Sequence, residues 1–103
     1  MMLEKLTADS FEDHLESIFL LDIDTDTPLA LKLSEVTRYT NPAFQNDKGI
    51  REPFSIIFIG PAQPILPQSS YVLKHDQMGV IDGIFLVPVG KDDQGCYYQA
   101  VFN

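Results

Sequence analysis

From about residue 17 onward, hydrophobic residues alternate with polar ones or gather in short runs, a pattern typical of β-strands. The segment PLALKLS places Leu29, Leu31 and Leu33 on one face of a half-buried strand. The alternation slips at Ser34–Glu35, which predicts a β-bulge there. The run FSIIFIG, residues 54–60, is apolar at successive positions and predicts a central strand covered on both faces.

Further strands are predicted on both sides of that run, in the segments SIFLLDI, SYVLKHD, GVIDGIFLVPV and CYYQAVFN. Turns containing Gly79 and Gly95 join the last three of these segments as hairpins. Because Pro88 has no amide hydrogen, its end of the strand should lie at a sheet edge or a bulge. The stretch 38–53 lacks periodic apolar residues and predicts the longest loop.

One segment near the N-terminus has helical spacing. Phe11, Leu15 and Ile18 recur at i, i+4 and i+7, and Thr7 can cap the first turn. This predicts a helix over about residues 7–16, too short to be stable unless it packs against the remainder of the domain.

The 103 residues therefore predict one domain, residues 1–103, that is mainly β: a small antiparallel β-barrel or sandwich of about six strands. The short N-terminal α-helix should plug one open end. Prolines between Gly60 and Ser70 delete backbone donors, so this stretch predicts a rigid corner over a barrel end, with Ile65 and Leu66 in the core. The alternative is a peptide-binding surface.

Charge narrows the range of partners. The net charge is −8, so binding to nucleic acid or to an anionic membrane is disfavoured. Residues 1–26 hold eight of the acidic residues against Lys5 alone, which indicates either a docking face for a basic partner or a solubilising face. With no Sec signal peptide and no apolar run of about 20 residues, a cytoplasmic location is expected, and export by another route stays open.

Metal chemistry finds little support in the sequence. Asp22, Asp24 and Asp26 are spaced like the start of a calcium loop, but Thr27 and Leu33 replace the glycine and glutamate that such a loop needs. The remaining candidates for metal ligation lack zinc-site spacing; they are His14, His75 and the lone Cys96. No metal or cofactor is expected.

Catalytic signatures are also absent from the sequence. No GxSxG elbow is present, and Cys96 has no basic neighbour to lower its pKa. Ser69 and Ser70 stand in a turn context, and Asp82 most simply marks an outward strand position. We therefore predict no catalytic, cofactor-binding or metal-binding residues, and a protein that is not an enzyme.

The C-terminal half, residues 52–103, resembles a family of small bacterial proteins known as domain of unknown function 6916. The motifs that carry the resemblance are Pro53–Ser55, Gly60–Pro61, Pro67–His75, Gly79, Phe85–Gly90 and Tyr98–Asn103. The opening LTADSFEDHLESIF resembles the helix that leads into the family's first strand. The resemblance implies no known chemistry. It does imply a role in, or accessory to, a phage-tail-like or fibre assembly, since genes of such proteins are often found near tail genes.

The function expected from these observations is a non-enzymatic protein-interaction or structural module whose partner is another protein. The alternative is a small-ligand-binding or enzymatic domain that uses the barrel mouth as a pocket. A further possibility is a homo-oligomer that pairs through an exposed edge strand.

Overall fold

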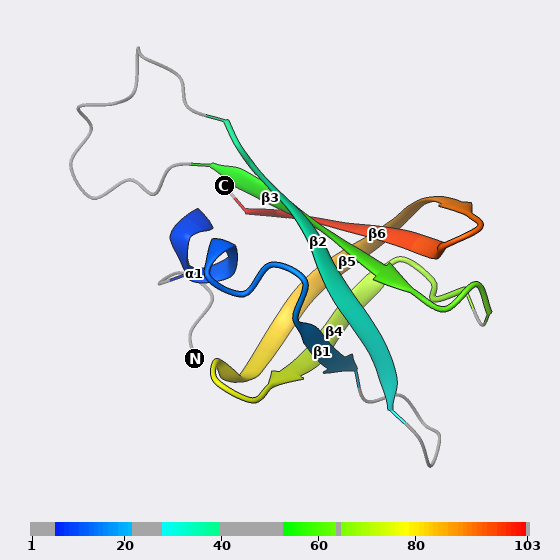
Figure 1. The fold of residues 1–103 in the computed structure, drawn as a ribbon, viewed down its shortest axis with the longest axis horizontal. Helices are drawn as coiled ribbons and strands as arrows, with labels where there is room; N and C mark the ends of the chain where they lie inside the picture. Colours follow the sequence, from blue (N-terminus) through cyan, green and yellow to red (C-terminus); the bar gives the residue numbers. More distant parts are fainter. Residues whose placement is uncertain (1–5, 22–27, 40–52, 64, 103) are drawn as a thin grey trace.

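The computed structural model describes residues 6–21, 28–39, 53–63 and 65–102. They form one short helix and six strands (Figure 1). The elements are α1 (Ala8–Glu12), β1 (Ile18–Leu21), β2 (Leu29–Arg38), β3 (Phe54–Gly60), β4 (Ser69–His75), β5 (Gly79–Asp92) and β6 (Gly95–Phe102).

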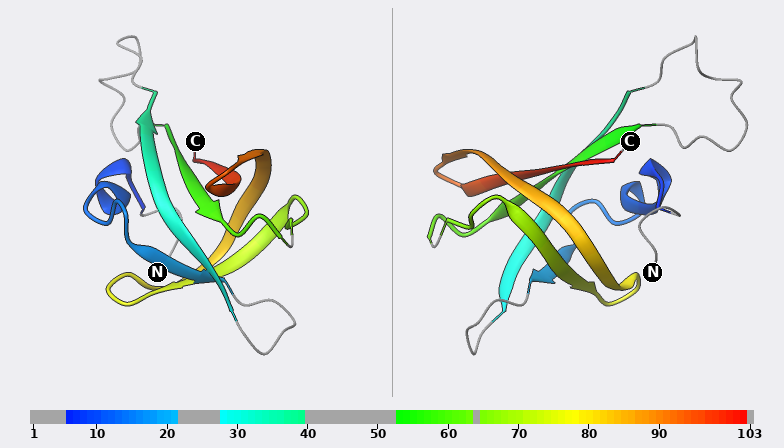
Figure 2. Two further views of the ribbon diagram at one scale, coloured as in Figure 1. Left: turned by 45° about the vertical axis from the view of Figure 1, so that its right-hand side comes forward. Right: turned by 180° about the vertical axis from the view of Figure 1, so that it is seen from behind.

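The six strands close into an antiparallel barrel in the order β1-β2-β3-β6-β5-β4, and β4 pairs back onto β1. The predicted mainly-β fold with about six strands is thus confirmed, and of the two predicted architectures the structure is the barrel and not the sandwich. The closing pair is short, since Leu20 pairs with Lys74 and Leu21 with Leu73. In this circular order the β1–β4 seam lies opposite the β3–β6 seam, as the views in Figures 1 and 2 show.

The barrel interior is filled by side chains. Inward positions alternate along each strand, and Phe19, Leu31 and Phe58 are fully buried. The rings of Phe19 and Phe58 meet edge to face, with centroids 5.2 Å apart. Close-packed aromatic and aliphatic side chains of this kind leave the lumen as core rather than as a channel.

Helix α1 plugs one end of the barrel, as predicted. The Phe11 ring is fully buried, and its centroid lies 5.9 Å from that of Phe54 and 5.6 Å from that of Phe102. The helix starts after Thr7, whose N–H donates to the Ser10 hydroxyl at 3.1 Å. The cap therefore ties the helix start while Phe11 holds the helix to the barrel.

The predicted helix bounds of about 7–16 are wrong at the C-terminal end, because the helix ends at Glu12. Glu16 adopts a positive φ of 71° and donates its N–H to the Leu33 carbonyl at 2.8 Å. The chain is thus pulled into pairing with β2 before another helical turn can form. Leu15 and Ile18 consequently leave the expected buried stripe and are 43% and 48% exposed.

The other end of the barrel is covered by the segment after β3. The Leu66 side chain is buried, and its N–H donates to the Tyr98 hydroxyl at 2.9 Å. Burial, the largest cause, raises the pKa of Tyr98 to about 12. The expected corner over a barrel end is therefore present, but the expectation for Ile65 is wrong, since its side chain is 51% exposed.

The predicted irregularities of the strands are confirmed. The β2–β3 register shifts between Leu33 and Glu35, and the β5–β6 register shifts between Pro88 and Gly90. Gly79 begins β5 with a φ of 79° directly after the β4–β5 turn. A bulge therefore accommodates Pro88 inside a closed sheet, where no edge is available.

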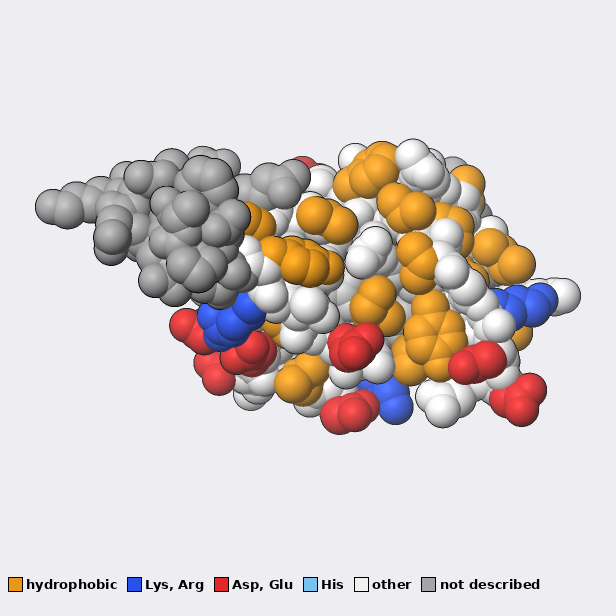
Figure 3. All heavy atoms as spheres, turned by 90° about the horizontal axis from the view of Figure 1, so that it is seen from above, with side chains coloured by type: hydrophobic (Ala, Val, Ile, Leu, Met, Phe, Trp, Pro, Cys, Tyr) orange, Lys and Arg blue, Asp and Glu red, His pale blue; other side chains and the backbone are white. Residues whose placement is uncertain are grey.

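The prediction that β3 is covered on both faces is only half right. Its inward face is core, but the outward Ile57 and Ile59 remain half-buried. No other layer of the described chain packs outside them, and hydrophobic side chains gather on this face (Figure 3). Separately, none of the described residues forms a helix long and apolar enough to cross a bilayer.

Candidate functional site

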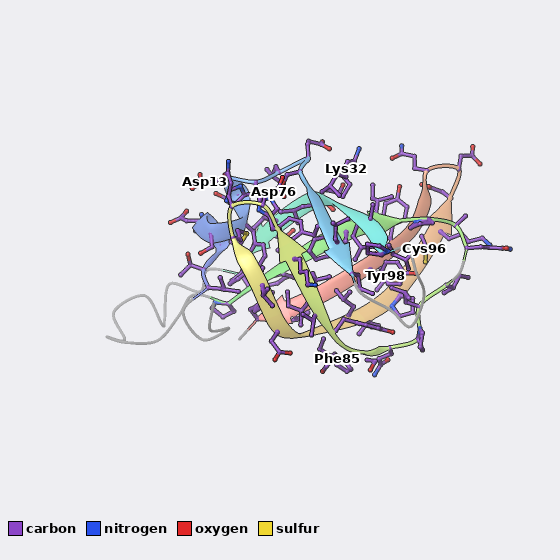
Figure 4. The ribbon with its side chains drawn as sticks, turned by 90° about the horizontal axis from the view of Figure 1, so that it is seen from below. Asp13, Lys32, Asp76, Phe85, Cys96 and Tyr98 are labelled. Carbon is purple, nitrogen blue, oxygen red and sulfur yellow. The ribbon has the colours of Figure 1, made fainter. Side chains whose placement is uncertain are left out.

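The site with the most converging polar groups lies at the α1 end of the barrel, beside the β1–β4 seam. Three segments meet there: the turn after α1, the start of β1 and the β4–β5 turn. Figure 4 shows Asp13 from the first segment and Asp76 from the last at the same end of the barrel, with Cys96 and Tyr98 toward the other.

His75 holds these segments together. Its Nδ1 accepts the backbone N–H groups of Gln77 and Met78 at 3.0 and 3.1 Å. Its Nε2 lies 3.0 Å from the Ser17 hydroxyl oxygen, and that hydroxyl bonds to the His14 carbonyl. The ring also lies between those of Phe19 and His14, tilted to both, with centroids 4.5 and 4.6 Å away.

These contacts fix the tautomer of His75. Since Nδ1 accepts two N–H groups it carries no proton, so the neutral ring is protonated at Nε2. Nε2–H then donates to Ser17, which donates its own proton to the His14 carbonyl. A general base must accept the proton of its nucleophile, and here the imidazole nitrogen facing Ser17 already holds one. The Ser17–His75 pair is therefore a structural link and not a catalytic dyad.

Burial, foremost, and the nearby positive charge of a protonated His14 lower the pKa of His75, while Asp76 opposes this effect. The direction agrees with the hydrogen bonds, because a proton on Nδ1 would face two backbone donors. The neutral ring is thus the form that the folded turn requires.

A groove runs over these side chains, made of two adjoining hollows of about 490 and 220 Å³ that share Ile18, His75 and Asp76. We call it the seam groove; its lining residues are Asp13, His14, Leu15, Ser17, Ile18, Leu20, Lys74, His75, Asp76 and Gln77. It combines exposed aliphatic side chains with two carboxylates, two imidazoles and the ammonium group of Lys74, a composition suited to binding an amphipathic segment.

The acidic N-terminal quarter is partly neutralised in the fold. Arg38 pairs with Asp9 and with Glu12, and Lys32 pairs with Glu16 at 3.3 Å. Within the described residues, no ion pair involves Asp13 or Asp76. Both carboxylates that line the seam groove therefore lack an ion pair within the described residues.

The other residues considered from the sequence lie elsewhere or outside the described chain. Asp22, Asp24 and Asp26 fall outside the described residues. Cys96 is a buried thiol at the far end of the barrel, Ser69 and Ser70 are exposed on β4 rather than in a turn, and Asp82 is exposed as expected. No three His, Cys, Asp or Glu side chains in the described ranges converge as a metal site would require.

Sequence reasoning missed the convergence of His14, Ser17 and His75. Ser17 and His75 are 58 positions apart, and only closure of the barrel between β1 and β4 brings them together. One local signal existed: a histidine placed two and three residues before the amides of a glycine-ended turn can accept their hydrogen bonds.

Comparison with known proteins adds one finding. The chain matches the family described as Domain of unknown function (DUF6916) over residues 6–102, so the match includes the N-terminal helix and strands as well as the C-terminal half. Searches of curated proteins and of solved structures returned no match. The chain belongs to the DUF6916 family.

Proposed function

We propose that this domain is a non-enzymatic protein-interaction module that binds a basic, amphipathic segment of a partner protein in the seam groove. The observation that carries the proposal is the pairing of exposed aliphatic side chains with unpaired carboxylates. Leu15 and Ile18 are 43% and 48% exposed, and Asp13 and Asp76 flank them in the same hollow.

The chemistry of the groove selects the partner. Leu15, Ile18 and Leu20 expose apolar surface to water, and covering this surface with a partner lowers the free energy of the complex. The carboxylates of Asp13 and Asp76, on a chain of net charge −8, attract Lys or Arg and repel acidic segments. A segment that alternates basic and aliphatic residues satisfies both requirements.

The packing of the barrel argues against the alternative of a ligand site in its mouth. Phe11 fills one end and Leu66 covers the other, and both are buried. The fixed tautomer of His75 likewise argues against nucleophilic chemistry at Ser17. The family resemblance supplies the setting that we propose, an assembly derived from or accessory to a phage tail.

Selection from a random peptide library on the immobilised domain tests the proposal. We expect enriched peptides to combine Lys or Arg with aliphatic residues, and their affinity to fall as salt is added. Ile18→Asp should weaken binding by about tenfold or more, because it places a charge at the apolar centre of the groove.

Phe85→Asp is the matched control, since Phe85 is also 48% exposed but does not line the groove. Equal binding to both variants, or enrichment of peptides without basic residues, would contradict the proposal.

A further inference from the structure

The outer wall of the barrel around the β3–β6 seam has an unusual composition. The outward side of an antiparallel barrel is ordinarily polar and charged. Here the outward positions of β3 and β6, with Val87 of β5, carry no charge: Ser55 lies beside Val101, Ile59 beside Tyr97, and Ile57 beside Gln99, which in turn lies beside Val87. We call these seven residues the neutral face.

Much of the neutral face is apolar and reaches solvent. Val101 is 54% exposed, and Ile57, Ile59, Val87 and Tyr97 are half-buried. Figure 3 views the molecule from this side: hydrophobic side chains gather among white polar and backbone atoms in the upper and central part of the described surface, and acidic side chains lie below them and reach toward its centre. A contiguous apolar surface of this kind on a soluble domain marks an interaction site.

The charges bordering the face indicate what covers it. On the β2 side, Lys32 continues the row of Ile59 and Tyr97. On the β5 side, Asp92 lies over Tyr97, whose hydroxyl donates to the Asp92 carboxylate at 2.8 Å. At the level of Tyr97 the β2 margin thus carries a base and the β5 margin an acid, and in the next row Glu35, which pairs with Ile57, adds an acid to the β2 margin.

A twofold axis parallel to the strands places the β2 margin of one copy over the β5 margin of another. Lys32 of each copy then faces Asp92 of the other, so the contact is complementary twice over. The face itself brings no like charges together, which matters for a chain of net charge −8. One copy of the chain thus carries both the base and the acid that this contact needs.

We propose that two copies of this chain associate face to face through the neutral face, with Lys32 and Asp92 setting their register. This goes beyond the proposed function, because it uses the wall opposite the seam groove. It also differs from pairing through an edge strand, since the closed strand order provides no free edge for that mode.

Sedimentation velocity and light scattering over a wide concentration range test the proposal. We expect the wild-type chain to approach twice the monomer mass of 11.6 kDa as concentration rises. Gln99→Glu, which places two carboxylates near the axis, and Val101→Lys should each weaken dimerisation by about tenfold or more. Phe85→Lys, on an exposed site outside the face, should leave it unchanged.

A charge swap tests the register. Lys32→Glu and Asp92→Lys should each weaken the dimer, and the double variant should recover part of the loss. Gln99→Glu changes no core residue, so it still tests dimerisation if the Val101→Lys variant fails to fold. A wild-type monomer at every concentration would overturn the proposal, and so would a dimer that is equally stable in Gln99→Glu and Phe85→Lys.

Discussion

At the residue scale, the far end of the barrel depends on two backbones that approach closely. Gly95 opens β6 with a φ of 138°, and a Cβ placed on it would collide with the Gly60 carbonyl oxygen. We expect Gly95→Ala to lower the free energy of unfolding by about 2–4 kcal/mol, because strain and a backbone clash add. Chemical denaturation monitored by circular dichroism measures the change.

Gly79→Ala is the control for that clash. Gly79 also has a positive φ, 79°, but a Cβ there meets open space. The free energy of unfolding of Gly79→Ala should therefore fall only by the conformational cost of about 1–2 kcal/mol. Equal losses at the two glycines would show that the approach of Gly95 to Gly60 contributes nothing.

A second residue-scale prediction concerns pH and His75. Its pKa is lowered in the folded state, so the unfolded chain binds the proton more readily. The stability that this group contributes is therefore fully present above about pH 6.5, the ordinary histidine value, and is lost as pH falls from there toward the folded pKa. The groups that face the ring are His14, Ser17 and Asp76.

The comparison is between wild type and His75→Gln, by urea midpoints at about pH 7.5 and about pH 5. At the higher pH the variant should be less stable by about 1–2 kcal/mol, since two backbone N–H groups lose their acceptor. Between the two pH values wild type should lose more stability than the variant. Parallel pH profiles would count against the role given to His75.

At the element scale, the strands were predictable and the end of the helix was not. The bulge at Ser34–Glu35 follows from a slip in a period of two, which any neighbouring strand would have to accommodate. The end of α1 depends on the Glu16 N–H bonding to Leu33 in β2, a contact that local spacing does not encode. The seam groove shares this limit, because barrel closure brings Ser17 to His75.

Two substitutions separate the predicted helix from the observed one. Phe11→Ala should cost about 3–5 kcal/mol, because it removes the buried ring that plugs the barrel. Leu15→Ala should change stability by less than about 1 kcal/mol, since Leu15 is 43% exposed and does not continue the buried stripe. Thermal unfolding of both variants measures the difference. A large loss of stability in Leu15→Ala would instead support the longer helix predicted from the sequence.

At the scale of the whole molecule, the barrel separates two kinds of surface. The seam groove lies at the β1–β4 seam and the neutral face around the β3–β6 seam, three strands away in either direction around the barrel. Charge is divided in the same way, with unpaired Asp13 and Asp76 at the groove and no charged residue within the neutral face. Partner binding and self-association therefore need not compete for the same surface.

Because the two surfaces point in opposite directions, a dimer formed through the neutral face presents two seam grooves outward. Because the two grooves point away from each other, one dimer can bridge two partners that lie on opposite sides of it. We expect wild type to cross-link beads densely coated with a selected peptide. Gln99→Glu, as a monomer at the same concentration, should bind the beads without cross-linking them. Turbidity of the bead suspension measures the difference. If wild type fails to cross-link the beads, with dimerisation established by sedimentation, one dimer cannot hold two partners at once.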